Sequence, residues 1–201
     1  LDSSSETIDQ LGHEYEALSA KLKVEADVLT SVRVAAANRL AELVTAELKE
    51  LAMGGASLVV EVGYADAYGS FGQDSVSIQL SSYPGAEPRP LGKGASGGEL
   101  SRIMLAIEVV LAETQQAPTF IFDEVDAGVG GAAAIEVGRR LAMLAQRAQV
   151  IVVTHLAQVA AYANAHLRVL KTSSVDFTAT DVVSLDAQAR IEELARMLSG
   201  L

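Results

Sequence analysis

An uninterrupted helical pattern over residues 4–53 constrains the fold of this chain more than any other feature of its sequence. The stretch contains no proline and a single glycine, Gly12. At a rise of 1.5 Å per residue, a helix of this length would extend for roughly 75 Å. Apolar residues recur along it at alternating spacings of three and four, which is typical of a helix that packs against a second helix. Because such a helix cannot bury an apolar stripe by itself, we expect it to need a partner.

The apolar stripe divides the predicted helix into two parts. It begins with Ile8, Leu11, Tyr15, Leu18 and Leu22, continues through Leu29, Val32 and Ala36, and then shifts to Leu40, Leu43, Leu48 and Leu51. We expect the first half to project as one arm of a coiled coil and the second half to dock on a folded domain; the alternative is an amphipathic helix that lies on the domain throughout. Met53, Gly54 and Gly55 end the helix, which predicts an arm over residues 1–53 and a domain over residues 54–201.

The pattern of the second part of the chain predicts an α/β domain. Residues 57–63 and 75–81 alternate apolar and polar side chains, as paired strands do, and a proline-rich stretch over residues 82–95 predicts an ordered loop. After Ser96 we expect helices over 97–115, 132–147, 156–163 and 187–199, and strands over 118–122, 149–153, 166–171 and 176–185. This alternation indicates a largely parallel, buried central sheet.

Composition and charge narrow the classes of function. The formal net charge is −11, which argues against strong binding of nucleic acid phosphates by this chain alone, because such binding requires clustered lysine and arginine; solubility also accounts for such a charge. The absence of cysteine excludes disulfides and thiolate metal sites and suits a reducing cytoplasm. No apolar run approaches the roughly 20 residues of a membrane span. Since the chain begins with Leu1 rather than methionine, we expect it to be a segment of a longer protein.

Two acids follow an apolar run in the middle of the domain. Residues 119–122 predict a buried strand that delivers Asp123 and Glu124 to its carboxyl end, where the ligand sites of open α/β sheets lie. Because adjacent residues of an extended chain point to opposite sides, the two acids can act differently. Asp123 can hold Mg²⁺, as the acid of a Walker B motif does, and Glu124 can polarise a water for attack on a terminal phosphate. The alternative is a solvated strand end or a helix-capping acid.

Ser96, Gly97, Gly98 and Glu99 form a polar turn that opens a predicted helix. The glycines allow backbone N–H groups to approach a phosphate closely, and a helix N-terminus favours an anion. Ser96 adds a hydroxyl donor. The same residues fit a capping box, in which Ser96 caps the helix and Glu99 bonds back to it. The two interpretations are compatible because one geometry serves both.

One histidine lies where the other candidate groups are expected to converge. His155 follows the apolar run 150–154, which predicts a place at the carboxyl end of a second strand, beside Asp123. There it could hydrogen-bond a terminal phosphate or the attacking water. We assign His13, on the predicted arm, and His166, before a predicted strand, to structure.

Residues 94–98 also fit the G-x-S-x-G pattern of a serine hydrolase. The members of its triad would follow one another in the order Ser96, Asp123 or Asp126, and His155. A nucleophile elbow needs a strand directly before the serine, and residues 88–93, which contain two prolines, cannot form a central strand. The serine hydrolase is therefore the weaker alternative.

The sequence lacks the G-x-x-x-x-G-K-[ST] loop that cradles phosphates. Its only Gly-Lys pair, Gly92-Lys93, is followed by Gly94 and has no glycine five residues before Gly92. We therefore expect that this chain alone neither holds ATP tightly nor hydrolyses it.

Three motifs, ASGGELSR, FIFDEVDAGVGG and VTHLAQVAA, occur in this order along the chain. With them, nearly the whole chain resembles the C-terminal part of the RecN family, which comprises bacterial DNA-repair ATPases related to SMC proteins. The resemblance implies an ABC-type ATPase head that is split in sequence by a long antiparallel coiled coil. This chain would form one coiled-coil arm and the C-terminal lobe of the head, and a missing N-terminal lobe would supply Walker A.

The resemblance also implies roles for individual residues. The turn at residues 96–99 is similar to the ABC signature, which contacts the γ-phosphate of ATP held by the opposite protomer. Asp123 resembles the Walker B aspartate that binds Mg²⁺, and Glu124 resembles the catalytic base. Asp126 falls in a segment similar to the D-loop at the dimer interface, and His155 resembles the switch histidine.

The function implied by this resemblance is ATP hydrolysis between two heads of a homodimer, in DNA double-strand break repair and recombination. DNA would be a partner of the full-length protein and a membrane would not, and the protein would work at the nucleoid in the bacterial cytoplasm. A second interpretation of the residues is a scaffold in which a coiled-coil arm joins an α/β domain that no longer hydrolyses ATP.

Overall fold

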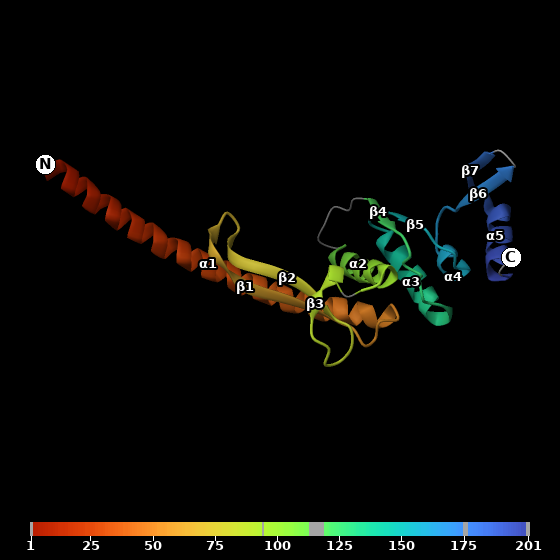
Figure 1. Ribbon diagram of the computed structural model, residues 1–201, viewed down its shortest axis with the longest axis horizontal. Helices are drawn as coiled ribbons and strands as arrows, with labels where there is room; N and C mark the ends of the chain where they lie inside the picture. Colours follow the sequence, from red (N-terminus) through yellow and green to blue (C-terminus); the bar gives the residue numbers. More distant parts are fainter. Residues whose placement is uncertain (1, 94, 113–118, 175–176, 200–201) are drawn as a thin grey trace.

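The computed structural model describes residues 2–93, 95–112, 119–174 and 177–199, and it is elongated, with one long helix projecting from a folded lobe (Figure 1). The helices are α1 (Asp2–Glu50), α2 (Gly97–Leu111), α3 (Gly131–Leu144), α4 (Ala157–Ala160) and α5 (Ala187–Ser199), with a 3-10 helix, η1, at Leu91–Lys93. The strands are β1 (Ser57–Gly69), β2 (Gly72–Ser81), β3 (Arg89–Pro90), β4 (Thr119–Phe122), β5 (Gln149–Val152), β6 (Leu167–Ser174) and β7 (Phe177–Ser184). Within the described residues, none of the helices is both long and apolar enough to cross a membrane.

Helix α1 is continuous, as the sequence predicts. Its N-terminal half stands away from the lobe (Figure 1), and the apolar stripe of this half is exposed at Ile8, Leu11, Tyr15, Leu18 and Leu22. Buried positions begin at Ala26, and Val44 and Leu48 have no exposed surface. The helix therefore has the projecting half and the docked half that the stripe predicts.

The docked face of α1 agrees with the predicted stripe at Leu48 and Leu51, which are fully buried, but departs from it in the middle of the helix. Val32 belongs to the predicted stripe but is 61% exposed, whereas Ala37 is buried. A straight α-helix drifts by about 20° per heptad relative to a strict 3.5-residue repeat, so the stripe turns away from the lobe. The β1–β2 hairpin selects the docked face instead, because Asp74 of β2 accepts hydrogen bonds from Thr30 (2.6 Å) and Arg33 (2.8 Å) of α1.

Within the described residues, three small sheets replace the largely parallel sheet that we expected. Strands β4 and β5 pair in parallel, whereas β1–β2–β3 and β6–β7 are antiparallel. The expected pairing of residues 57–63 with residues 75–81 is confirmed by β1 and β2. The expectation of parallel strands was wrong for β6 and β7, because only a few residues connect them and a parallel pair needs a crossover of a dozen or more residues. It was also wrong about burial: Ile121, on one face of the parallel pair, is 70% exposed.

The other predicted elements agree with the structure to within a few residues, apart from the hairpin. Strand β1 continues past its predicted end at residue 63, and strand β2 begins before its predicted start at residue 75. Gly94 lies outside the described residues, and so do the predicted helix end at residue 115 and the predicted strand starts at residues 118 and 176.

The core lies where the end of α1 meets α2 and α3. Its most deeply buried side chains are Val44, Leu48, Leu51, Ile103, Leu105, Val125, Val137 and Leu144. Arg140 of α3 reaches across to α1, where its Nε lies 3.0 Å from Glu47, and its Nη1 lies 2.6 Å from Glu136 of its own helix. Apolar packing and this ion pair together hold the docked end of α1 on α3.

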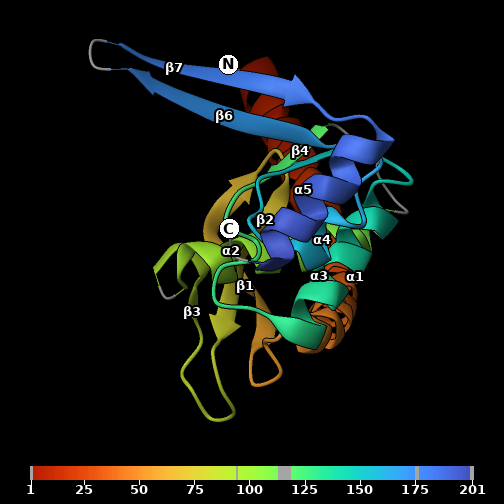
Figure 2. The same ribbon diagram turned by 90° about the vertical axis from the view of Figure 1, so that its right-hand side faces the viewer.

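A second small unit lies at the end of the lobe farthest from the projecting half of α1. Helix α5 lies beside the β6–β7 hairpin (Figure 2), and Arg168 of β6 pairs with Glu193 of α5 at 3.2 Å. Arg190 of α5 donates to the main-chain oxygen of Ala161 at the end of α4 (3.0 Å). This unit is therefore joined to the rest of the lobe through α4.

Replacing Leu48 by alanine should lower the free energy of unfolding by about 2–5 kcal/mol, because the substitution leaves a cavity in the core. Leu18→Ala removes the same atoms from an exposed position on the same helix and should change the free energy by less than about 0.5 kcal/mol. Urea denaturation of the two variants measures both values. Equal losses would show that the N-terminal stripe of α1 is already buried against another chain in solution.

Candidate functional site

The parallel pairing of β4 and β5 brings the candidate groups to one edge of the lobe. Phe122 and Val152 are paired at the ends of the two strands, and the Val153 amide donates to the Phe122 main-chain oxygen (2.9 Å). The residues that follow both strands therefore lie at the same edge. The structure places His155 against Asp126, with 3.3 Å between Nδ1 and Oδ2.

The two acids after β4 do not continue the extended chain. Glu124 has a φ of +57°, a left-handed conformation that non-glycine residues seldom adopt. The Glu124 amide donates to Asp123 Oδ1 (2.9 Å), and the Ala127 amide donates to the Glu124 main-chain oxygen (2.9 Å). A tight turn therefore replaces the strand end, so the alternation expected of these two side chains does not apply. Both side chains are nonetheless exposed.

Asp126 faces into its own chain. Its side chain is only 2% exposed, and its Oδ2 accepts hydrogen bonds from the Thr154 hydroxyl and from the His155 amide (3.1 Å). The carboxylate connects the turn after β4 to the turn after β5. The place at a dimer interface that the D-loop resemblance implies for Asp126 stays a prediction.

The first turn of α2 has the predicted capping box. The Glu99 amide donates to Ser96 Oγ (3.4 Å), and Glu99 Oε2 accepts from the Ser96 amide (2.8 Å) and hydroxyl (2.9 Å). Gly97 is exposed, and a Cβ added there would lie 2.6 Å from Glu124 Oε2. Gly98 is buried against Ala127. The turn therefore packs directly on the loop that carries the acids.

Two residues that our sequence analysis did not single out hold this contact together. Ser101 Oγ donates to the Asp123 main-chain oxygen (2.6 Å), and Arg102 Nη1 donates to the Ala127 main-chain oxygen (2.8 Å). Burial lowers the pKa of Arg102, and Glu99 and Asp126 oppose that shift as nearby negative charges. A charged residue inside an apolar helical stretch is the signal that could have identified Arg102, because buried arginines are almost always paired.

The serine hydrolase triad is not assembled. The Ser96 hydroxyl donates to Glu99 and His155 pairs with Asp126, and no hydrogen bond in the described part of the chain joins Ser96 to His155. The segment before Ser96 contains only the two-residue edge strand β3 and η1, so the strand that a nucleophile elbow requires is missing from the described residues.

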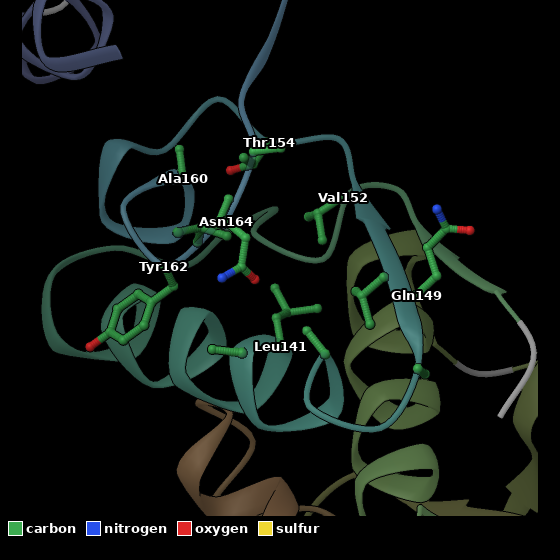
Figure 3. Close-up of a pocket in the computed structure, with 14 residues that line it drawn as sticks. Leu141, Gln149, Val152, Thr154, Ala160, Tyr162 and Asn164 are labelled. Carbon is green, nitrogen blue, oxygen red and sulfur yellow. The ribbon is translucent and has the colours of Figure 1, made fainter. Parts of the chain in front are cut away.

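A cavity of about 290 Å³ lies behind the turn after β5, between α3, β5 and α4. Figure 3 shows Leu141, Val152, Thr154, Tyr162 and Asn164 around it. Its walls are largely apolar. The cavity meets the candidate site only at Thr154, and the acids after β4 do not line it.

The chain is similar to RecN proteins along nearly all of its length. It is 52% identical over 199 residues to the DNA repair protein RecN of Streptomyces coelicolor, a match that covers 93% of this chain and 35% of the relative. It is 46% identical to the RecN of Mycobacterium leprae and 41% identical to that of Vibrio cholerae, and both matches cover 100% of this chain, with 37% and 36% of the relatives. The chain thus spans little more than a third of these proteins. No family model matches it.

Solved structures of SMC head domains share the fold. A Smc head domain with a coiled coil from Pyrococcus yayanosii superimposes with a TM-score of 0.57 at 22% identity, over 82% of this chain and 30% of that one. A Smc head domain from Pyrococcus furiosus gives 0.53 at 20% identity, over 83% of this chain and 39% of that one. The fold is therefore that of the C-terminal lobe of an SMC-like, ABC-type head with a long N-terminal helix.

Gly98→Ala should destabilise the chain by about 1–3 kcal/mol, because overpacking forces its surroundings to move. An added Cβ would lie 2.7 Å from Ala127 Cβ and 2.9 Å from the Glu124 main-chain oxygen. Gly92→Ala is the matched control, since no atom lies within 4 Å of a Cβ at that position. Thermal unfolding compares the two variants, and a Gly98→Ala protein as stable as the control would refute the close packing of the two turns.

Acid should weaken the cap of α2. Hydrogen bonds from the backbone and then the side chain of Ser96 lower the pKa of Glu99 below its ordinary value of 4.5. A carboxyl group with a lowered folded-state pKa contributes stability that is present above its unfolded value and lost as pH falls through the folded value. Glu99→Gln should therefore flatten the fall in unfolding free energy below about pH 4.5. Urea denaturation across acidic pH measures the slope, with Glu87→Gln, in an exposed loop, as the control; an unchanged slope in Glu99→Gln would contradict the prediction.

Proposed function

Because this chain belongs to the RecN family of DNA repair proteins, we propose that it forms the C-terminal lobe and one coiled-coil arm of an ATP-hydrolysing head that acts in DNA double-strand break repair and recombination. One observation carries this proposal. The capped turn of α2, the acids after β4 and the histidine after β5 come from three separate segments, yet they meet at one edge of the lobe. Nucleotide sites of α/β proteins lie at such an edge, outside the carboxyl ends of the strands.

The turn at residues 96–99 suits a terminal phosphate. It opens a helix of 15 residues, whose N-terminus favours an anion. Gly97 has no side chain to cover the backbone, and the group next to it is the end of the Glu124 side chain. Ser96 is exposed and can turn its hydroxyl toward a ligand. We assign this turn to binding the γ-phosphate of an ATP molecule that the opposite head of a homodimer holds. The opposite head supplies the other residues of that ATP site.

The acids suit the metal and the attacking water. Mg²⁺ keeps several waters and takes one or two carboxylates together with phosphate oxygens. An exposed Asp123 fits this donor set, and within the described residues no three acids or histidines form a complete metal site of their own. We assign Asp123 to Mg²⁺ and Glu124 to polarisation of the attacking water. The exposed imidazole of His155 is assigned to the terminal phosphate or that water.

Exposed apolar faces indicate where the rest of the head binds. Ile121 and Ile151 are paired on β4 and β5 and point to the same open face, together with Val153. Leu167, Val169 and Val182 form a second exposed face on β6 and β7. Covering the apolar surface of both sheets with another part of the protein would stabilise the folded state, because it removes that surface from water. We propose that the N-terminal lobe of the same protein, which would carry Walker A, covers both faces.

The arm and the charge of the chain suggest how the head is used. The exposed stripe of α1 needs a second helix, which the other arm of an antiparallel coiled coil would supply. Since this chain carries a net charge of −11, we place the main DNA contacts elsewhere in the full-length protein. ATP hydrolysis between two heads would then open and close a dimer that is linked to DNA through other parts of the molecule.

Mg²⁺-dependent ATP hydrolysis by this chain co-expressed with the N-terminal lobe tests the proposal, with each piece alone as a control. Activity only in the mixture supports a split ATPase. Activity of this chain alone would contradict the need for an external Walker A. A folded mixture that binds ATP without turnover would favour the scaffold instead.

Glu124→Gln should lower kcat of the complete protein roughly 10²- to 10⁴-fold, the usual contribution of a general base, because the amide cannot accept a proton from water. ATP binding should persist, since the substitution leaves the phosphate-binding turn intact. Steady-state hydrolysis and equilibrium binding of a labelled nucleotide measure the two effects, and Glu87→Gln controls for loss of a charge elsewhere. Unchanged turnover would exclude Glu124 as the base.

A further inference from the structure

We propose that Asp126 is a positioning residue that fixes the tautomer of His155, placing the proton on Nδ1 and leaving the Nε2 lone pair free. The identity of the group that Nε2 contacts depends on the proposed function, whereas the tautomer does not depend on it. Asp126 acts through the imidazole.

The surroundings of the Asp126 carboxylate carry the inference. Its side chain is 2% exposed, and a single oxygen, Oδ2, lies within reach of three groups. Two of them, the Thr154 hydroxyl and the His155 amide, donate hydrogen bonds to it. The third is His155 Nδ1 at 3.3 Å. A buried carboxylate is stable only when donors surround it.

Only one protonation pattern of a neutral imidazole suits this contact. If Nδ1 were unprotonated, its lone pair would face a carboxylate oxygen, and the two acceptors would repel each other. With the proton on Nδ1, the contact becomes a hydrogen bond to a charged acceptor. A partner at one ring nitrogen sets the protonation of the other, so Nε2 is left as an acceptor.

The rest of the network holds the carboxylate in place. Arg102 is buried close enough to Asp126 for the two charges to attract each other. The Leu156 amide donates to Thr154 Oγ1 (3.1 Å), so the Thr154 hydroxyl proton remains directed at Asp126. The imidazole is 73% exposed although its Nδ1 edge is held. Neutral His155 can therefore accept a hydrogen bond from the attacking water at Nε2.

A purely structural role for Asp126 makes a different prediction. In that case the carboxylate would matter only because it ties the turn after β5 to the turn after β4 through Thr154 and the His155 amide. Loss of Thr154 Oγ1 and loss of the carboxylate would then have similar consequences, and neither would change the imidazole protons. The tautomer separates the two explanations.

The test is ¹⁵N NMR of the complete protein with labelled histidine and no nucleotide, in which His155→Gln identifies the His155 signals. The wild-type protein should show His155 protonated at Nδ1. Asp126→Ala should shift the population toward Nε2–H, Asp126→Asn should do so partly because an amide oxygen is a weaker acceptor, and Thr154→Val should retain Nδ1–H. A wild-type imidazole protonated at Nε2 overturns the inference without any variant, and so does an unchanged tautomer in folded Asp126→Ala.

Kinetics supply a second readout. Asp126→Ala should lower kcat roughly 10- to 100-fold, as loss of a partner that orients a functional histidine does, with little change in KM. The same substitution in a His155→Gln background should add little, because the two residues act as one unit. Additive effects would overturn the inference. If the tautomer is as proposed but His155→Gln hydrolyses ATP normally, the role assigned to His155 fails and the positioning by Asp126 stands.

Discussion

The close contact between the first turn of α2 and the turn after β4 determines where the candidate groups of this lobe lie. Gly98 permits it, because any side chain there would overlap Ala127. Ser101 and Arg102 then donate hydrogen bonds to main-chain oxygens of the same turn. Since these bonds are made to the backbone, they hold the path of the turn without occupying the side chains that it presents. Asp123 and Glu124 therefore remain exposed next to the capped end of α2.

Burial separates the groups that hold the site from those available for chemistry. Arg102 and Asp126 are buried, and Asp126 acts on Arg102 as a nearby negative charge. Arg102 donates to main-chain oxygens, and Asp126 accepts from a hydroxyl and a main-chain amide. Glu124 and His155 are exposed. Buried polar networks are stable only when their members are paired, and this one positions two exposed side chains from different strand ends. The same interactions thus stabilise the lobe and orient the candidate site.

The site is connected to the projecting helix through α3. This helix starts at Gly131, shortly after the turn that holds Asp126, and its apolar face packs on the docked end of α1. Arg140 adds ion pairs with Glu47 and Glu50 of α1. The turn, α3 and the docked half of α1 therefore form one continuous packed body, and the exposed stripe of α1 begins where this packing ends.

The sequence alone determined the features that depend on local patterns. The spacing of apolar residues predicted α1 and most other elements, the capping box followed from Ser96 and Glu99, and the placement of acids and a histidine after strands followed from their neighbours. Only the tertiary structure decided the left-handed turn at Glu124 and the inward direction of Asp126. These features depend on which distant residues meet: Asp126 is turned inward by donors 28 and 29 positions further along the chain. The spacing of apolar residues in the sequence indicates whether a side chain is buried, but it does not identify the distant residue that the side chain contacts.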